Sequence, residues 1–359
     1  MSEDIYRQLA ARLDAIPNGF PPTASGVERR LLAALFTPEE AALAAVMKLS
    51  SEPAAAIAAR AGVDAQQARQ TLKTMVRKGL IRAGRGDGEM AYGLLPFVVG
   101  IYEAQLGRLD AEAAALFEEY YRETGATFVG EKPSVHRVIP VGEAIPVNLE
   151  VFPYEHAAQL IENAQAWAVR DCICRVQKRL IGQGCEHPVQ NCLSFAPVAG
   201  VFDHDPVARP LTKAEALRIL EEAAEAGLVH TTGNYRDGVS YICNCCTCSC
   251  GVLRAVAEFG LPTAVARADF RAVVDDWECL GCGDCQERCQ CGALSLGGDV
   301  CQVDEARCVG CGQCTTVCPS GALTLERRPE GERESIPANL RAWMEQRARQ
   351  RGLDLGDVL

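Results

Sequence analysis

The sequence of 359 residues predicts an α+β fold divided among several domains. Three observations predict it. The first hundred residues carry helical hydrophobic patterns and then a hairpin pattern, nine cysteines lie mid-chain between amphipathic helices, and two cysteine-rich runs of identical spacing follow. We expect five segments in chain order: an N-terminal helix over 1–24, a helical domain ending in a hairpin over 25–98, a central cysteine-rich α/β domain over 99–265, a domain built from the two runs over 266–328, and a C-terminal helix over 329–359.

The composition favours a soluble protein of a reducing compartment. The chain is 48% hydrophobic but has no apolar run long enough to span a bilayer, so we expect no membrane insertion. Its first ten residues predict an amphipathic helix rather than a signal peptide. Nineteen cysteines in an unexported chain favour metal ligation over disulfides. We therefore expect a cytoplasmic protein that works where oxygen is low.

The net charge of −11 is unevenly distributed. Residues 1–100 hold 12 Lys and Arg against 10 Asp and Glu, whereas the remainder holds 24 against 37. An acidic surface of this kind suits docking to a basic partner protein, and a solvated face kept for solubility explains it equally well.

The first third of the chain predicts a helix-turn-helix followed by a hairpin. The helical pattern covers 27–35, 38–48, 52–61 and 64–78, with Asp64 as the N-cap of the last helix, and the strands are expected over 80–83 and 90–95. This order resembles the winged-helix fold over residues 25–95. The resemblance implies a second helix that enters the DNA major groove or, in other members, a protein-docking or dimerisation module.

The basic residues of this segment help to decide between DNA binding and protein docking. Arg69, Lys73 and Arg77 share one face of the second helix, and Arg82 and Arg85 lie on the expected wing, as DNA binding would require. The net charge of +2 over residues 1–100 is low for phosphate binding and favours docking to protein. Nucleic acid binding through 25–95 is therefore the less favoured of the two readings.

The central region carries nine cysteines in two groups, which predict at least one further metal site. The first group is Cys172, Cys174, Cys185 and Cys192, and the second is Cys243, Cys245, Cys246, Cys248 and Cys250. The first group could complete one tetrathiolate site alone. In the second group, Cys243, Cys246 and Cys250 have the spacing C-x2-C-x3-C, which supplies three ligands of a cubane cluster.

Two neighbouring side chains have uncertain roles. His187 is either an imidazole ligand or a structural turn residue, and Arg175 could donate to sulfur. Expected helices over 154–168 and 212–226 frame the cysteine loops. Cys291 and Cys301 are isolated in the sequence and are expected to be small buried hydrophobic residues.

The two runs near the C-terminus, 279–289 and 308–318, share the spacing C-x2-C-x2-C-x3-C. Two-residue gaps let a tight loop deliver three thiolates to one compact iron–sulfur cluster. Zinc knuckles fit less well because zinc sites usually take their ligands in two pairs, and a disulfide framework fits no better.

These runs, with the paired endings Gly292-Ala293-Leu294 and Gly321-Ala322-Leu323, resemble two-cluster bacterial ferredoxins over residues 272–326. The resemblance implies two [4Fe–4S] clusters whose fourth ligand comes from the other run. Cluster 1 would be held by Cys279, Cys282, Cys285 and Cys318, and cluster 2 by Cys308, Cys311, Cys314 and Cys289. Gln290 departs from the pattern, which has a proline after the fourth cysteine, as Pro319 does in the second run.

The chain beyond residue 25 also resembles uncharacterised 4Fe-4S binding proteins of anaerobic bacteria and archaea. The resemblance rests on Cys-Ile-Cys-Arg at 172–175, Cys-Glu-His-Pro at 185–188 and Cys-Asn-Cys-Cys at 243–246, ahead of the two runs. It implies iron–sulfur electron transfer without naming a substrate.

We therefore expect a protein that passes single electrons through two [4Fe–4S] clusters and a third, central iron–sulfur cluster, to or from a redox partner protein. The sequence contains neither a G-x-G-x-x-G motif after an expected strand nor a Walker loop, so it predicts no nucleotide site. This favours an electron-transfer component over a stand-alone enzyme. Two alternatives remain: a redox-responsive transcription regulator that uses the winged helix, and a reductase with the central metal site as its active centre.

Overall fold

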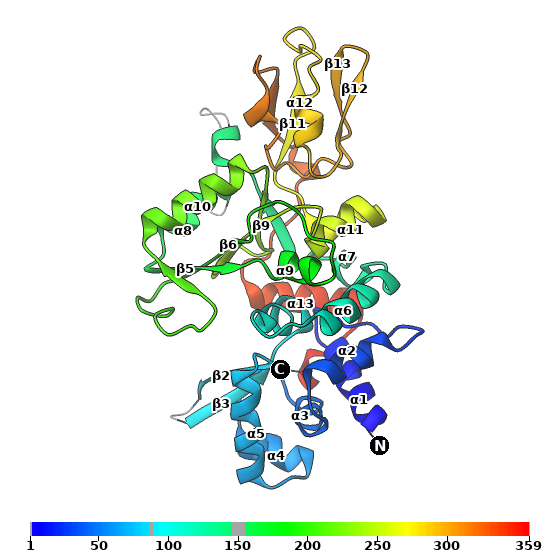
Figure 1. The fold of residues 1–359 in the computed structure, drawn as a ribbon, viewed down its shortest axis with the longest axis vertical. Coiled ribbons are helices and arrows are strands. Elements are labelled where there is room, and N and C mark those ends of the chain that lie inside the picture. Colours follow the sequence, from blue (N-terminus) through cyan, green and yellow to red (C-terminus); the bar gives the residue numbers. More distant parts are fainter. Residues whose placement is uncertain (1, 87–88, 146–154, 359) are drawn as a thin grey trace. The chain divides into compact units, whose positions relative to one another are not determined.

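The computed structural model describes residues 2–86, 89–145 and 155–358 (Figure 1). Helices and strands both contribute substantially, in agreement with the predicted α+β class. The chain forms two compact units. Unit 1 comprises Met1–Phe128, Leu180–Gly182 and Met344–Leu359, and unit 2 comprises Val129–Arg179 and Gln183–Trp343. No helix in the described part of the chain is both long and apolar enough to cross a membrane.

Unit 1 is mainly helical. Its helices are α1 (Ser2–Asp14), α2 (Val27–Leu35), α3 (Pro38–Ala44), α4 (Ala54–Ala61), α5 (Ala65–Arg77) and α6 (Ala111–Glu123), and its three-stranded sheet has the order β1 (Glu52–Pro53), β3 (Glu89–Leu94), β2 (Ile81–Gly86). Two further helices, α7 (Thr127–Gly130) and α13 (Leu340–Arg351), begin in one unit and end in the other.

Capping residues fix the ends of these helices. Asp64 accepts hydrogen bonds from the backbone N–H groups of Gln66 and Gln67 at 2.9 Å and so starts α5, as its N-cap position predicts. Thr37 and Glu40 form a capping box at the start of α3. The helix expected from residue 52 begins instead at Ala54, because Pro53 disfavours the helical conformation at Glu52 and Glu52 pairs with Tyr92 of β3.

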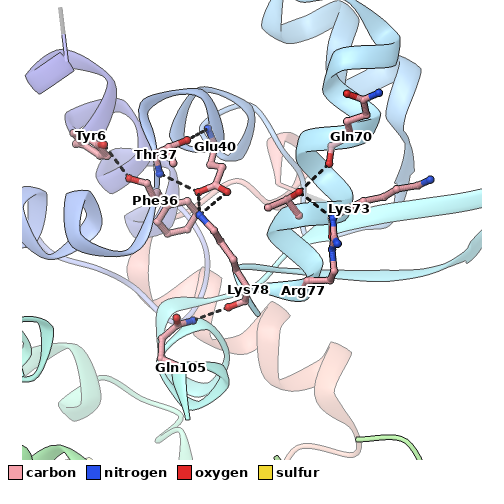
Figure 2. Close-up of polar contacts among 10 residues, drawn as sticks. Tyr6, Phe36, Thr37, Glu40, Gln70, Lys73, Arg77, Lys78 and Gln105 are labelled. Carbon is pink, nitrogen blue, oxygen red and sulfur yellow. Dashed lines mark hydrogen bonds and ion pairs between the residues drawn. The ribbon is translucent and has the colours of Figure 1, made fainter. Parts of the chain in front are cut away.

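Polar contacts tie α3 to α5 and to the segment that follows it (Figure 2). The ammonium group of Lys78 lies 2.8 Å from the carboxylate of Glu40, whose side chain is only 4% exposed. Gln105 donates a 3.2 Å hydrogen bond to the carbonyl of Lys78. A buried carboxylate of this kind needs its charged partner, so this contact holds the two helices in one arrangement.

Unit 2 is built on a seven-stranded sheet. Its strand order is β10 (Val265–Ala266), β4 (His136–Ile139), β8 (Val229–Gly233), β9 (Tyr241–Cys245), β6 (Gln190–Ala196), β5 (Ala166–Asp171) and β7 (Arg209–Leu211), and only the β10–β4 pair is parallel. The helices that accompany it are α8 (Ala157–Glu162), α9 (Ile173–Leu180), α10 (Lys213–Glu225) and α11 (Gly251–Phe259).

Apolar side chains join the sheet to α8 and α10. Ile161 of α8 and Ile219 of α10 are buried in one cluster with Val169, Leu193 and Ile242 of three neighbouring strands. Figure 1 shows α8 and α10 side by side, and the cluster accounts for their amphipathic pattern. The expected helix over 154–168 is shorter than predicted, because residues from Ala166 on belong to β5; its first residue, 154, lies outside the described residues.

The C-terminal part of unit 2 carries the two cysteine runs in loops beside two small two-stranded sheets. Strands β11 (Phe270–Val274) and β14 (Leu323–Arg327) pair, as do β12 (Leu294–Gly297) and β13 (Val300–Val303), and helix α12 (Asp284–Arg288) lies within the first run. Both pairs are antiparallel. Single turns of 3-10 helix lie at Glu103–Gln105, Gly142–Ala144, Pro262–Ala264, Thr315–Val317, Glu330–Glu332 and Leu355–Asp357.

Candidate metal centres

The first cysteine run lines a small cavity together with one cysteine of the second run. Cys279, Cys282, Cys285 and Cys318 all border it. Gly281 turns the loop with a φ of +62°, where a Cβ atom would come within 2.5 Å of the Asp299 carbonyl oxygen. The loop can therefore take this path only with glycine at that position.

The second run lines its own cavity in the reciprocal way. Cys308, Cys311 and Cys314 border it together with Cys289 of the first run. The backbone N–H of Ala293 donates to the sulfur of Cys289 at 3.3 Å. Burial raises the pKa of the Cys311 thiol to about 12, so a bound cation is what would keep this sulfur ionised at neutral pH.

A fifth cysteine borders each of these cavities, which the sequence did not indicate. Cys301 borders the first and Cys291 the second, and each is only 3% exposed. The sulfur of Cys301 lies 3.5 Å from that of Cys285, and its backbone N–H donates to Cys279 at 3.4 Å. Both residues are buried, as expected. Each lies beside the cysteines expected to bind a cluster, where its thiol contributes to the polar surroundings of their sulfur atoms.

The central cysteines fall into two sets that cut across their order in the sequence. The first, which we call the compact set, is Cys185, His187, Cys246 and Cys248, whose ligand atoms all lie within 4.8 Å of one another. The sulfurs of Cys185 and Cys246 are 4.0 Å apart. Burial raises the pKa of Cys246 to about 12, while burial and the positive charge of Arg175 lower the pKa of His187 and so favour its neutral imidazole.

The other six central cysteines form what we call the sulfur row. Interactions between neighbouring thiols, which shift the pKa values of Cys172, Cys174, Cys250, Cys245 and Cys243, connect the six in the order Cys172, Cys174, Cys250, Cys245, Cys243 and Cys192. Cys172 lies between β5 and α9, and the others come from α9, the start of α11, β9 and β6. Cys174 holds the pKa of Cys172 down at about 7 through a hydrogen bond, although burial opposes this shift.

Strand geometry separates residues that the sequence placed in one group. Cys243 and Cys245 are two residues apart on β9, so their side chains share one face of the sheet, and Cys246 follows where the strand ends. The spacing C-x2-C-x3-C of Cys243, Cys246 and Cys250 is therefore divided between the two sets. Cys185 is likewise separated from the rest of its group, because it joins Cys246.

Arg175 lies between the two sets and is 1% exposed. It donates hydrogen bonds to Asn191 Oδ1 at 2.9 Å and to the carbonyl of Asn244 at 3.0 Å. Burial alone would lower the pKa of the Arg175 guanidinium, but the negative charges of Cys172 and Cys246 raise it above its usual value. A buried guanidinium needs a negative partner, and thiolates bound to a metal would supply one.

His136 on β4 is the residue of this region that the sequence analysis missed. It is 6% exposed, and neither ring nitrogen has a hydrogen-bond partner among the described residues. Burial lowers its pKa, and the Cys250 thiolate opposes that shift, which makes the imidazole a neutral neighbour of the sulfur row. A lone histidine carries no spacing signal, so only the fold could reveal this position.

The basic residues of the expected DNA-binding face lie in unit 1. Arg69, Lys73 and Arg77 are exposed on α5, and Figure 2 shows the Lys73 side chain extending away from the other residues drawn. Arg77 bonds to its own helix through Thr74 Oγ1 at 3.2 Å, and Arg82 donates to the carbonyl of Leu49. Arg85 is exposed on β2. Whether this face binds DNA or protein stays a prediction.

Comparison with known families identifies one segment of this region. Residues 301–324, which contain all four cysteines of the second run, match the 4Fe-4S binding domain. This segment is a 4Fe-4S binding domain. It indicates at least one [4Fe–4S] cluster and supports iron–sulfur electron transfer as the general function of the chain. No curated protein matches the sequence.

Proposed function

We propose that this protein passes single electrons between partner proteins through two [4Fe–4S] clusters in residues 266–328 and a third iron–sulfur cluster in the central part of unit 2. The observation that carries the proposal is the crossed pairing around the two cavities. Cys279, Cys282 and Cys285 meet Cys318, and Cys308, Cys311 and Cys314 meet Cys289. Each set supplies the four thiolates that one [4Fe–4S] cluster requires, and such clusters exchange single electrons.

The first cavity lies close to the protein surface. Cys282 is exposed, and the neighbouring Leu280 and Trp277 are 68% and 97% exposed. Exposed acidic residues Asp276 and Glu278 flank Trp277. An aromatic side chain with acidic neighbours suits a transient contact with a basic redox partner, so we assign electron entry or exit to this face.

The second cavity is connected to the central part of the same unit. The backbone N–H of Val141 donates to the carbonyl of Cys311 at 2.9 Å, and Gln313 Nε2 donates to the carbonyl of Leu228 at 2.7 Å. These bonds involve two residues of the second run, so the loop that would hold cluster 2 is fixed against the central sheet.

Gln290 makes a further connection, and it explains the departure from the ferredoxin pattern. Its Oε1 accepts hydrogen bonds from both the backbone N–H and the hydroxyl of Thr247, each at 3.1 Å. Thr247 lies between Cys246 and Cys248 of the compact set, and Gln290 follows Cys289 directly. Proline at position 290 could make neither bond, so glutamine couples the loop of cluster 2 to the central cysteines.

The sulfur row supports a third cluster. It offers six thiols, two more than a [4Fe–4S] cluster needs, and these come from two separate segments of the chain, 172–192 and 243–250. Arg175 lies beside this row and supplies a positive charge that would stabilise the more negative, reduced form of a cluster there.

An electron count tests this function. Each cubane accepts one electron, so we expect the fully loaded protein to take up about three electrons per chain in an anaerobic titration with dithionite. Electron paramagnetic resonance spectra of the reduced samples should show more than one signal, each appearing over its own range of potential. Uptake of fewer than two electrons per loaded chain would contradict the proposal.

A further inference from the structure

We propose that the compact set binds a single tetrahedral zinc ion, as a structural site separate from every iron–sulfur cluster of the chain. The set consists of two pairs, Cys185 with His187 and Cys246 with Cys248, each separated by one residue. The first pair lies in the loop after α9 and the second in the loop after β9. The ion would join these two loops.

The size of the set decides the kind of metal centre. Two thiolates bound tetrahedrally to zinc at about 2.3 Å lie about 3.8 Å apart. The sulfurs of Cys185 and Cys246 are 4.0 Å apart, and all four ligand atoms lie within 4.8 Å of one another. A cubane places four irons between its thiolates and holds their sulfurs much further apart. The compact set therefore has room for one ion but not for a cluster.

The sulfur row and the two ferredoxin cavities differ in this respect. Among the described residues, neither the eight cysteines of the two runs nor the six of the row form a group of three or more ligand atoms as close as those of the compact set. The structure thus distinguishes one mononuclear set from the sets that suit clusters.

The donor atoms also favour zinc. Three cysteines and one histidine, supplied as two pairs, form one of the usual ligand sets of structural zinc, although the gap of one residue is shorter than the common two to four. Zinc with three thiolates carries a net charge of −1. The buried guanidinium of Arg175, which interacts with Cys246, balances this charge.

The position of the site gives it a role. Cys246 directly follows Cys245 of the sulfur row, and Thr247, between two zinc ligands, donates both hydrogen bonds to Gln290. Zinc bound here would fix the loop from which both contacts arise. The site would therefore fix the position of the sulfur row relative to the end of the first ferredoxin run, where Cys289 would bind cluster 2, without itself exchanging electrons.

The test is metal analysis of the full chain, produced with both iron and zinc supplied and purified without oxygen. We expect about one zinc per chain in the wild-type protein and less than about a tenth of that in Cys248→Ser, with iron and acid-labile sulfide unchanged. Cys243→Ser, in the sulfur row, is the matched control and should lose iron and sulfide but keep zinc. Absence of zinc from the wild-type protein, or loss of sulfide from Cys248→Ser, would overturn the proposal.

A second variant covers the case in which Cys248→Ser fails to fold. His187→Cys should retain zinc, and its zinc-edge X-ray absorption spectrum should change from three sulfurs and one nitrogen to four sulfurs. A spectrum identical to that of the wild-type protein would show that His187 is not a ligand and would refute the site as proposed.

Discussion

Replacing Cys318 by serine is expected to destroy the cluster held by Cys279, Cys282 and Cys285 and to spare the one held by the rest of its own run. The reason is that Cys318 borders the first cavity, whereas Cys308, Cys311 and Cys314 border the second. Serine is a poor ligand of iron, so about four irons per chain should be lost or one cluster degraded.

Alkylation of free thiols, read by mass spectrometry, identifies which cluster is lost. In Cys318→Ser, Cys279, Cys282 and Cys285 should become reactive while Cys308, Cys311 and Cys314 stay protected. The matched control, Cys289→Ser, should give the mirror image. Labelling of the second run in the Cys318→Ser protein would mean that each run holds its own cluster and would reject the crossed arrangement.

Gln290→Pro restores the usual ferredoxin residue, and we expect it to slow electron exchange between cluster 2, which Cys289 helps to hold, and the central cysteines. The substitution removes two hydrogen bonds to Thr247. At about 1 kcal/mol each, their loss should reduce the docked population of the loop, and with it the internal transfer rate, by roughly tenfold or more. Iron content should not change, since proline is common at this position of such runs.

The measurement is rapid photoreduction followed by freeze-quenched electron paramagnetic resonance of each cluster. Gln286→Ala, an exposed substitution on α12 in the same run, is the control and should behave as the wild-type protein does. An unaltered transfer rate in Gln290→Pro, with all clusters present, would show that this contact has no part in coupling them.

Local sequence signals predicted much of the fold. Asp64 starts α5 as its N-cap position predicts, and the helix expected over 212–226 is α10, because caps act on the nearest few backbone groups and need no tertiary context. The boundary at Pro53 was less well predicted, because the pairing of Glu52 with Tyr92 depends on a strand 40 residues away.

The candidate sites also differ in whether local sequence signals or only the fold could predict them. The ferredoxin runs could be recognised from the sequence, because three expected ligands of each site lie in one loop with fixed spacing. The compact set and the sulfur row each combine residues from distant elements, so sequence spacing alone could not predict which of these cysteines lie together. His136 reaches Cys250 only because β4 belongs to the same sheet as β9.

The count of iron and acid-labile sulfide in anaerobically purified, fully loaded protein tests the central claim most directly. Two ferredoxin clusters and a central one require about twelve irons and twelve sulfides per chain, falling to about eight in Cys243→Ser. A wild-type value that stops at about eight irons, with the sulfur row free to react with alkylating reagents, would contradict the account and leave only the two ferredoxin clusters.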